Sequence, residues 1–285
     1  MKELPRELSE KKDRLLDLLR SYESCAVAFS GGLDSAVLAK AAQLALGEKA
    51  VAVTGVSDSL AVGELDEAKE VAEAIGIKHE VVETGELKIP EYQENTSNRC
   101  YHCKTELFRQ VEAIASQTEM AVVADGSNRD DHGEHRPGIR AAQEQKVCSP
   151  LADSDFTKDE IRALAAHWEL PIWDKPATPC LSSRIAYGEQ VTSERLAMID
   201  AAERFLRDKG FQPLRVRYHR GDVARVEVAS EEVRRLTEEP LRSEIVERLK
   251  KAGFQYVSID LEGFRSGSLN AVLPTELLQI SDKRK

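Results

Sequence analysis

The feature that most constrains the fold is the turn at residues 30–35, SGGLDS, because it joins an apolar run to a helical pattern. Residues 25–29 (CAVAF) are short, apolar and bounded, which is typical of a buried strand. Residues 36–42 (AVLAKAA) predict a helix. Unpaired backbone N–H groups and the positive end of the helix dipole gather at such a turn, and its two glycines let the backbone approach a ligand closely. The turn therefore predicts a site for an anion.

This turn is not a Walker A loop, because no Gly-Lys-Ser/Thr sequence closes it. SGGLDS instead resembles the PP-loop of the ATP pyrophosphatases, which bind ATP, transfer AMP to a substrate oxygen and release pyrophosphate. An ordinary glycine-rich turn is the alternative, and the position between a strand and a helix argues against it.

Strand and helix patterns alternate through the first two thirds of the chain. Strands are predicted at 50–54, 79–83, 120–124 and 147–151, and helices at 8–22, 64–76 and 103–116. A capping box from Thr157 to Glu160 opens one more helix. This alternation predicts an α/β fold with a doubly wound parallel sheet. The PP-loop resemblance implies the same fold, that of the adenine nucleotide alpha hydrolase-like ATP pyrophosphatases.

The pattern changes after Gly188. A helical stretch at 192–209 precedes two strand patterns, 214–219 and 223–229, which a hairpin-like turn separates. Helical segments and a last strand at 254–260 follow. We therefore expect two domains: a PP-loop domain at 1–188, and a smaller α+β domain at 189–285 for substrate binding or oligomerisation.

The balance of acidic and basic side chains limits the classes of partner that the protein is expected to bind. The 50 acidic and 40 basic side chains give a net charge of -10, which argues against a nucleic-acid partner. The first eight residues, MKELPREL, do not resemble a signal peptide, and no run reaches the ~18 apolar residues of a membrane span. We expect a cytoplasmic protein with a small-molecule substrate.

Five cysteines are present, and an odd count argues against a disulfide framework. Cys25 and Cys148 lie in apolar runs and are predicted to be buried packing residues. Cys100 and Cys103 form a CxxC pair, which occurs in redox, zinc and iron–sulfur sites. No second CxxC exists, so a four-cysteine zinc site is not expected. Together with Cys180, the pair gives three thiolates, which suits a 4Fe–4S cluster with one iron left open; two incidental cysteines at a helix start are the alternative.

Cys180 ends a proline-rich stretch at 171–180 and precedes Arg184. A nearby guanidinium favours the reactive thiolate form of a cysteine. A packing cysteine is the alternative interpretation.

The strand at 214–219 places two arginines, Arg215 and Arg217, on one face because side chains alternate along a strand. Paired arginines suit a phosphate or a carboxylate ligand, although a solvated face is the ordinary alternative. Glu203 lies on the preceding predicted helix. A simple ion pair with Arg207, one helical turn later, is one interpretation of this residue.

The acidic segment 125–131, DGSNRDD, follows a predicted strand. Its side chains suit Mg²⁺ or a nucleotide, whereas Asp and Asn are also common turn formers.

Taken together, these segments resemble the LarE family over nearly the whole chain. They are SGGLDS, RCYHCK, DGSNRDDHGEHRPG, SPLADSDFTKDEIRALA, WDKPATPCLSSRIAYG and LRVRYHR. The family makes part of the nickel-pincer nucleotide cofactor of lactate racemase. The resemblance implies an ATP- and Mg²⁺-dependent sulfur transferase that adenylates pyridinium-3,5-biscarboxylic acid mononucleotide and converts a carboxylate to a thiocarboxylate.

The resemblance also implies roles for individual residues. Cys180 matches the family's nucleophile and Glu203 an active-site glutamate. Phosphate-binding arginines correspond to Arg184, Arg215 and Arg217. The ATP-binding positions correspond to Ser30, Gly31, Gly32, Asp34, Ser35, Val53, Thr54, Gly126 and Arg129.

Two sulfur sources are compatible with the resemblance. Family members with one active-site cysteine sacrifice its sulfur and retain dehydroalanine. Members with three are thought to pass on a sulfide from a 4Fe–4S cluster. Cys100, Cys103 and Cys180 give this chain the three-cysteine set, which favours the cluster. The family forms oligomers, so a homo-oligomer is expected by analogy.

Three other functions fit parts of the pattern. A tRNA thiolase shares the PP-loop and CxxC but needs a basic RNA-binding surface. An ammonia-using synthetase of the same superfamily does not need Cys180. A non-catalytic nucleotide-binding module predicts AMP binding without pyrophosphate release.

Overall fold

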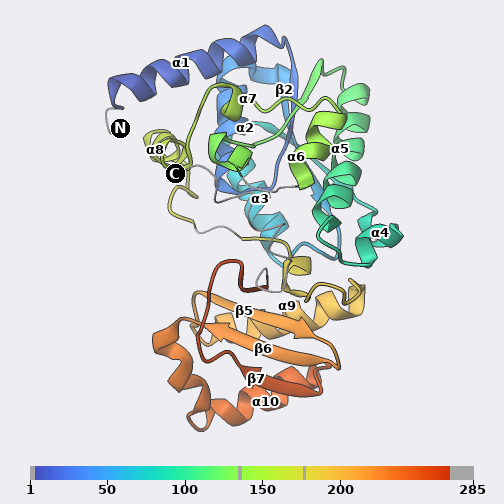
Figure 1. Cartoon of the computed structure of the whole chain (residues 1–285). Coiled ribbons are helices and arrows are strands. Elements are labelled where there is room, and N and C mark those ends of the chain that lie inside the picture. The colour runs from blue at the N-terminus through green and yellow to red at the C-terminus, as the bar shows by residue number, and fades with distance from the viewer. Residues whose placement is uncertain (1–3, 134–136, 176–177, 270–285) are drawn as a thin grey trace.

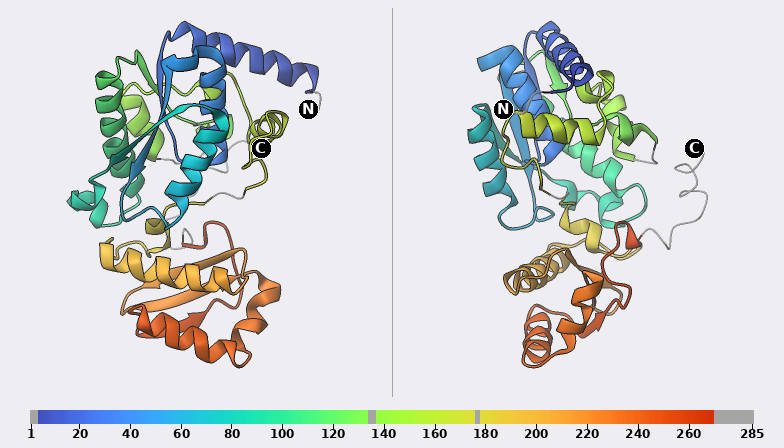
Figure 2. Two further views of the ribbon diagram at one scale, coloured as in Figure 1. Left: turned by 180° about the vertical axis from the view of Figure 1, so that it is seen from behind. Right: turned by 90° about the vertical axis from the view of Figure 1, so that its left-hand side faces the viewer.

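The computed structural model describes residues 4–133, 137–175 and 178–269, which form two sheets with helices packed against them (Figure 1). A four-stranded sheet has the strand order β3-β2-β1-β4, and a three-stranded sheet has the order β5-β6-β7. Seen from behind and from the side, the small sheet and its helices lie at one end of the larger unit (Figure 2).

The larger sheet is parallel throughout. Its strands are β1 (Cys25–Ala28), β2 (Ala50–Val56), β3 (Lys78–Glu83) and β4 (Val122–Ala124). The predicted doubly wound parallel sheet is thus confirmed. Strand β2 continues two residues beyond the predicted end at Thr54.

Alternate residues of β1 face opposite layers of helices. Cys25 and Val27 pack into one core with side chains from four helices: α1 (Arg6–Ser21), α2 (Leu33–Leu46), α3 (Glu64–Ile75) and α8 (Lys158–His167). Ala26 and Ala28 pack into a second core with α5 (Arg99–Gln117) and α6 (Pro137–Glu144). Side chains buried on both faces explain why the strands read as continuous apolar runs.

Two predicted elements differ from the structure. Helix α5 begins at Arg99, so Cys100 and Cys103 both lie in its first turns. The predicted strand at 147–151 is wrong: Cys148 makes a single bridge to Ala124, and helix α7 (Pro150–Asp153) begins directly afterwards. Proline at the first helical position is preorganised for a helix, and this ends the extended run.

Short helical turns complete the first part of the chain. They are η1 (Gly47–Lys49), η2 (Glu86–Lys88), α4 (Pro90–Gln93), η3 (Arg129–Gly133) and η4 (Leu181–Arg184). The predicted capping box is present, because Thr157 Oγ1 accepts from Glu160 N at 3.2 Å and the Glu160 carboxylate accepts from Thr157 N at 2.9 Å.

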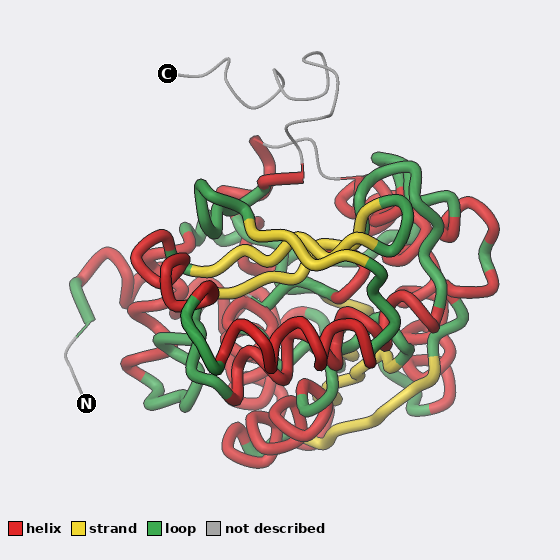
Figure 3. The backbone as a smooth tube through the Cα atoms, turned by 90° about the horizontal axis from the view of Figure 1, so that it is seen from below, coloured by secondary structure: helices red, strands yellow, loops and turns green. Residues whose placement is uncertain are grey.

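The small sheet pairs β5 (Leu214–His219) antiparallel with β6 (Val223–Val228), and β6 parallel with β7 (Tyr256–Ile259). Helices α9 (Ser193–Asp208) and α10 (Leu241–Lys251) share a core with one face of the sheet, and the 3₁₀ helix η5 (Ser230–Thr237) lies between β6 and α10 in the chain. Figure 3 shows the three strands side by side with helices along one side. Arg215 and Arg217 alternate along β5 with core residues, so they lie on the opposite face.

The core of the small sheet also takes in residues that precede Gly188. Tyr92, Leu181 and Ile185 are buried in it, and Ile185 bridges to Tyr218. The division at residue 188 therefore remains a proposal. No described helix is long and apolar enough to cross a membrane.

Candidate active site

The turn after β1 is held by hydroxyl groups. Ser35 Oγ accepts from Ser30 N at 3.2 Å and donates to Gly32 O at 3.0 Å, and the two serine hydroxyls are 3.1 Å apart. Gly31 has φ +70, and a Cβ there would lie 2.9 Å from Ala68 Cα in α3. Only glycine fits this position without moving α3.

A cavity of about 970 Å³ opens beside this turn, at the carboxyl ends of the parallel strands. Ligands bind at these ends in open α/β sheets. Six predicted ATP-binding residues line it: Ser30, Gly32, Asp34, Ser35, Thr54 and Gly126. The cavity also reaches Cys100 in α5 and Pro179, the neighbour of Cys180. The turn after β1, Cys100 and the neighbour of Cys180 thus border one continuous space.

Gly126 brings the loop after β4 directly onto the beginning of α2. A Cβ at this position would lie 2.9 Å from Ser35 N and 3.0 Å from Asp34 C. Because these are backbone atoms, they cannot yield as a flexible side chain would. Gly126 is therefore required by close backbone packing at the turn after β1.

Three of the predicted ATP-binding residues, Val53, Thr54 and Arg129, differ in their surroundings. Val53 is buried in the core, and its carbonyl accepts from Phe29 N at 2.8 Å. Thr54 Oγ1 donates to Phe29 O at 2.8 Å and lies 2.8 Å from His79 Nε2, whose pKa is lowered by burial and by nearby Lys69. Arg129 does not line the cavity and pairs with Asp155 at 3.3 Å.

Lys158, which the sequence analysis missed, forms an ion pair with Asp34. It is the first residue of α8, and its backbone N–H donates to Asp130 Oδ2 at 2.8 Å. The partners are 124 residues apart, so no local pattern relates them. The pair places a cation at the edge of the cavity.

Four carboxylates line the same cavity: Asp34, Glu64, Asp125 and Asp131. Asp125 is buried and accepts hydrogen bonds from Ser127 Oγ at 2.8 Å and Ser149 Oγ at 2.9 Å. Mg²⁺ binds through one or two carboxylates together with substrate phosphates. The oxygen donors beside the turn fit that ion.

The three cysteines of the predicted cluster lie near one another but differ in surroundings. Cys100 and Cys180 are exposed, whereas Cys103 packs against the core of the small sheet. Burial raises the pKa of the Cys103 thiol, and Cys180, Glu86 and Cys100 raise it further. Within residues 4–133, 137–175 and 178–269, no three His, Cys, Asp or Glu side chains are arranged to hold a metal ion. The predicted cluster therefore receives no support from this geometry.

Cys25 and Cys148 were predicted to be buried packing residues, and only Cys25 is fully buried. Cys25 is buried in the core, and burial together with Cys148 raises its pKa to about 12. Cys148 is half-buried, and burial raises its pKa as well. Both thiols are thus disfavoured as thiolates.

Buried polar groups hold the segment that follows Cys180. Arg99 is 6% exposed and donates to Ser182 O at 2.8 Å. Tyr92 Oη lies 2.6 Å from Ser182 Oγ and 3.1 Å from Ser59 Oγ, which donates to Glu86 Oε1 at 2.6 Å. Glu86 Oε2 is buried without a hydrogen-bond partner among the described residues. None of these contacts was foreseen.

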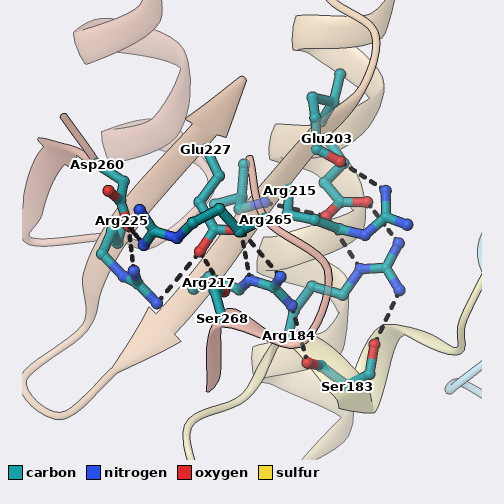
Figure 4. Close-up of polar contacts among 12 residues, drawn as sticks. Ser183, Arg184, Glu203, Arg215, Arg217, Arg225, Glu227, Asp260, Arg265 and Ser268 are labelled. Carbon is teal, nitrogen blue, oxygen red and sulfur yellow. Dashed lines mark hydrogen bonds and ion pairs between the residues drawn. The ribbon is translucent and has the colours of Figure 1, made fainter. Parts of the chain in front are cut away.

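Arg184 and Glu203 form a buried ion pair (Figure 4). Arg184 Nη1 also donates to Cys180 O at 2.9 Å, so this guanidinium holds the backbone that carries the thiol. Arg207 Nη2, the alternative partner, lies 4.0 Å from Glu203 Oε2, which is farther than the Arg184 guanidinium.

Arg217 is held by Glu227 on the neighbouring strand, with Nε 3.0 Å from Oε2 (Figure 4). Glu227 is fully buried and also receives Arg225 Nη2 at 3.3 Å and Ser268 Oγ at 2.6 Å. Arg217 Nη1 donates to Ser183 O at 3.1 Å, which brings it beside the Cys180 segment. The solvated-face alternative is thus wrong for Arg217.

Arg215 differs from the other two predicted arginines, because it has no ion-pair partner among the described residues. Its Nη1 donates to Leu214 O at 2.6 Å, and its guanidinium lies 5.3 Å from the centre of the Phe264 ring. Burial and the charges of Arg184 and Arg217 lower its pKa to about 10. An anion bound here would offset this positive charge.

Comparisons with known proteins agree with this geometry. Residues 15–114 match the family model described as asparagine synthase. The chain is 42% identical over 266 residues to the uncharacterized protein slr1717 of Synechocystis sp. The matched region covers 93% of this chain and 99% of that protein.

A second relative has a named activity. The chain is 34% identical over 267 residues to the pyridinium-3,5-bisthiocarboxylic acid mononucleotide synthase of Lactiplantibacillus plantarum, covering 93% of this chain and 96% of that protein. Identity of this degree over nearly the full length of both chains establishes common membership. The chain therefore belongs to the LarE family of ATP-using PP-loop enzymes.

Proposed function

We propose that this chain is an ATP-dependent sulfur transferase that converts a carboxylate of pyridinium-3,5-biscarboxylic acid mononucleotide to a thiocarboxylate. The observation that carries the proposal is the continuous cavity between the PP-loop and the Cys180 segment. A carboxylate activated at one end of such a space lies within reach of a thiol at the other. The named relative makes the corresponding bisthiocarboxylic acid mononucleotide.

In the first step, a substrate carboxylate oxygen attacks the α-phosphate of ATP, and pyrophosphate leaves. The backbone N–H groups at the start of α2 and the hydroxyls of Ser30 and Ser35 would bind the phosphates. Lys158 would add positive charge near the leaving group after exchanging its partner Asp34. Mg²⁺, held by carboxylates such as Asp34 and Asp125, would supply further charge neutralisation.

The substrate carries a phosphate and two carboxylates, and the arginine face of the small sheet matches that charge. Arg215 is the proposed primary phosphate contact because it lacks an acidic partner among the described residues. Arg217 is already paired with Glu227, so we assign it to orient the substrate. Arg184 is already paired with Glu203, so we assign it to orient the Cys180 backbone. Planar guanidinium groups suit both anions.

In the second step, the Cys180 thiolate attacks the acyl adenylate and AMP leaves. In the sacrificial route, loss of the Cys180 Cα proton and cleavage of its Cβ–S bond release the thiocarboxylate and leave dehydroalanine. Because no three His, Cys, Asp or Glu side chains among the described residues are arranged to hold a metal ion, we derive no step through an iron–sulfur cluster. A homo-oligomeric state and a cytoplasmic location accompany this proposal as predictions.

The test is product formation by the purified chain with ATP, Mg²⁺ and pyridinium-3,5-biscarboxylic acid mononucleotide. We expect substrate-dependent pyrophosphate release and a thiocarboxylate detected by mass spectrometry. Cys180→Ala should keep pyrophosphate release and lose the thiocarboxylate, whereas the control Cys148→Ala should keep both. Full activity of Cys180→Ala, amide formation with ammonia, or retention on RNA with thiolation of that RNA would overturn the proposal.

A further inference from the structure

The segment at residues 261–269, here called the C-terminal strap, crosses from the small sheet to the nucleotide cavity. It leaves the end of β7, and its Ser266 and Gly267 line the cavity that also contains the PP-loop. Figure 1 shows it returning toward the larger sheet. No sequence motif pointed to this segment.

Backbone contacts fix the beginning of the strap. Phe264 N donates to Val228 O at 2.7 Å, and Gly263 N donates to Asp260 O at 3.1 Å. Gly263 has φ +72, and a Cβ there would lie 2.8 Å from Val228 O. The strap is therefore packed tightly against the end of β6, which carries Glu227.

Two strap side chains contact the arginine face. The Phe264 ring lies 5.3 Å from the guanidinium of Arg215, the arginine without an acidic partner among the described residues. Ser268 Oγ donates to Glu227 Oε1 at 2.6 Å, while Glu227 Oε2 holds Arg217 at 2.9 Å and 3.0 Å (Figure 4). Phe264 thus contacts Arg215 directly, and Ser268 is linked to Arg217 through Glu227.

We propose that Phe264 and Ser268 are positioning residues that orient Arg215 and Arg217 toward the anionic group of the substrate. An aromatic face fixes a guanidinium without neutralising it, so Arg215 keeps its full charge for the ligand. The Ser268 hydroxyl and Arg225 share one oxygen of Glu227, and the other oxygen holds Arg217. This inference takes the identity of the substrate from the proposed function. The contacts of Phe264 and Ser268 do not depend on that function.

The variants are Phe264→Leu, which removes the aromatic face, and Ser268→Ala, which removes the hydroxyl. Phe264→Tyr and Ser268→Thr retain those groups. Ser258→Ala is the matched control, because Ser258 Oγ donates to Ala224 O at 2.9 Å on β6 and, among the described residues, makes no hydrogen bond to Arg215, Arg217 or Glu227. Thermal unfolding of every variant checks the fold.

The first readout is the affinity for inorganic phosphate, measured by calorimetry with the nucleotide cavity filled by a non-hydrolysable ATP analogue. We expect affinity to fall about fivefold in Phe264→Leu and about tenfold in Ser268→Ala, at an unchanged Tm. The two conservative variants and the control should bind as the wild type does. Wild-type affinity in both truncated variants, or no phosphate binding by the wild type, would overturn the inference.

The second readout compares KM for the pyridinium mononucleotide with KM for ATP. KM for the pyridinium mononucleotide should rise in Phe264→Leu and Ser268→Ala, while KM for ATP stays unchanged. An equal rise in both KM values would indicate a general structural effect and contradict the inference. If the wild type binds phosphate but does not turn over the pyridinium mononucleotide, the proposed function fails, and the phosphate comparison still decides the role of the strap.

Discussion

Arg184 and Glu203 face each other in a doubly hydrogen-bonded ion pair, with Nε 3.0 Å from Oε1 and Nη2 3.1 Å from Oε2. Both side chains are almost fully buried, at 1% and 2% exposure. Glu203 Oε1 also accepts from Val216 N at 3.0 Å, and Arg184 donates to Cys180 O. The pair therefore joins α9, β5 and the segment that carries the proposed nucleophile.

Removing one partner of this pair should destabilise the protein strongly. Glu203→Gln leaves the buried Arg184 charge without a carboxylate, which costs about 3 kcal/mol of unfolding free energy. Denaturant unfolding measures it. The double variant Arg184→Met/Glu203→Leu should recover part of the loss, because no charge remains buried. A double variant that is less stable than Glu203→Gln would contradict this explanation.

Gly126→Ala should impair ATP binding. The added Cβ meets backbone atoms of Ser35 and Asp34, so the start of α2 must move. We expect affinity for ATP to fall about tenfold, the equivalent of about 1.4 kcal/mol. The control is Gly85→Ala, where the nearest atom to a Cβ is Glu106 Oε1 at 3.4 Å. Equal ATP affinity for the two variants, measured by calorimetry, would show that the close packing is irrelevant.

Arg215→Met should stabilise the ligand-free protein while weakening substrate binding. The half-buried Arg215 lies near two other arginines and has no acidic partner among the described residues, so its charge opposes folding until an anion binds. We expect a gain of about 1 kcal/mol in unfolding free energy and a KM for the pyridinium mononucleotide at least about tenfold higher. A lower Tm together with an unchanged KM would refute both parts.

Asp260 should contribute pH-dependent stability. Burial tends to raise its pKa, but the Glu262 backbone N–H and the guanidinium groups of Arg265 and Arg225 outweigh burial, and the net shift is downward. A lowered pKa in the folded state means that the stabilisation is present above the unfolded pKa of about 4 and is lost as pH falls through the folded value. The difference in unfolding free energy between wild type and Asp260→Asn should therefore be constant from pH 6 to 8. It should shrink below about pH 4. A difference that grows on acidification would contradict the assignment.

Local sequence patterns were sufficient for the larger sheet. Strands β1 and β2 are continuous apolar runs, and α3 places Ala68, Val71, Ala72 and Ile75 on its buried face. Patterns failed where one residue changed the backbone preference, as Pro150 did at the predicted strand 147–151. The start of α5 was missed because RCYHCK carries little apolar periodicity.

The site was only partly predictable. Alternation placed Arg215 and Arg217 on one face, but it did not identify Glu227, which lies diagonally across the hairpin from Arg217. The hairpin register contains that signal, since it pairs Arg215 with Glu227. The contact between Lys158 and Asp34 spans 124 residues and depends on how α8 packs against α2, so tertiary structure alone places it.

The most direct test of the central claim is the intact mass of anaerobically purified protein before and after turnover with ATP, Mg²⁺ and the pyridinium mononucleotide, with iron and labile sulfide assayed on the same sample. The account predicts loss of one H₂S equivalent per chain, localised to Cys180, and no bound iron. An unchanged mass with bound iron and more than one product per chain would contradict it. That result would assign the sulfur to a cluster held by Cys100, Cys103 and Cys180.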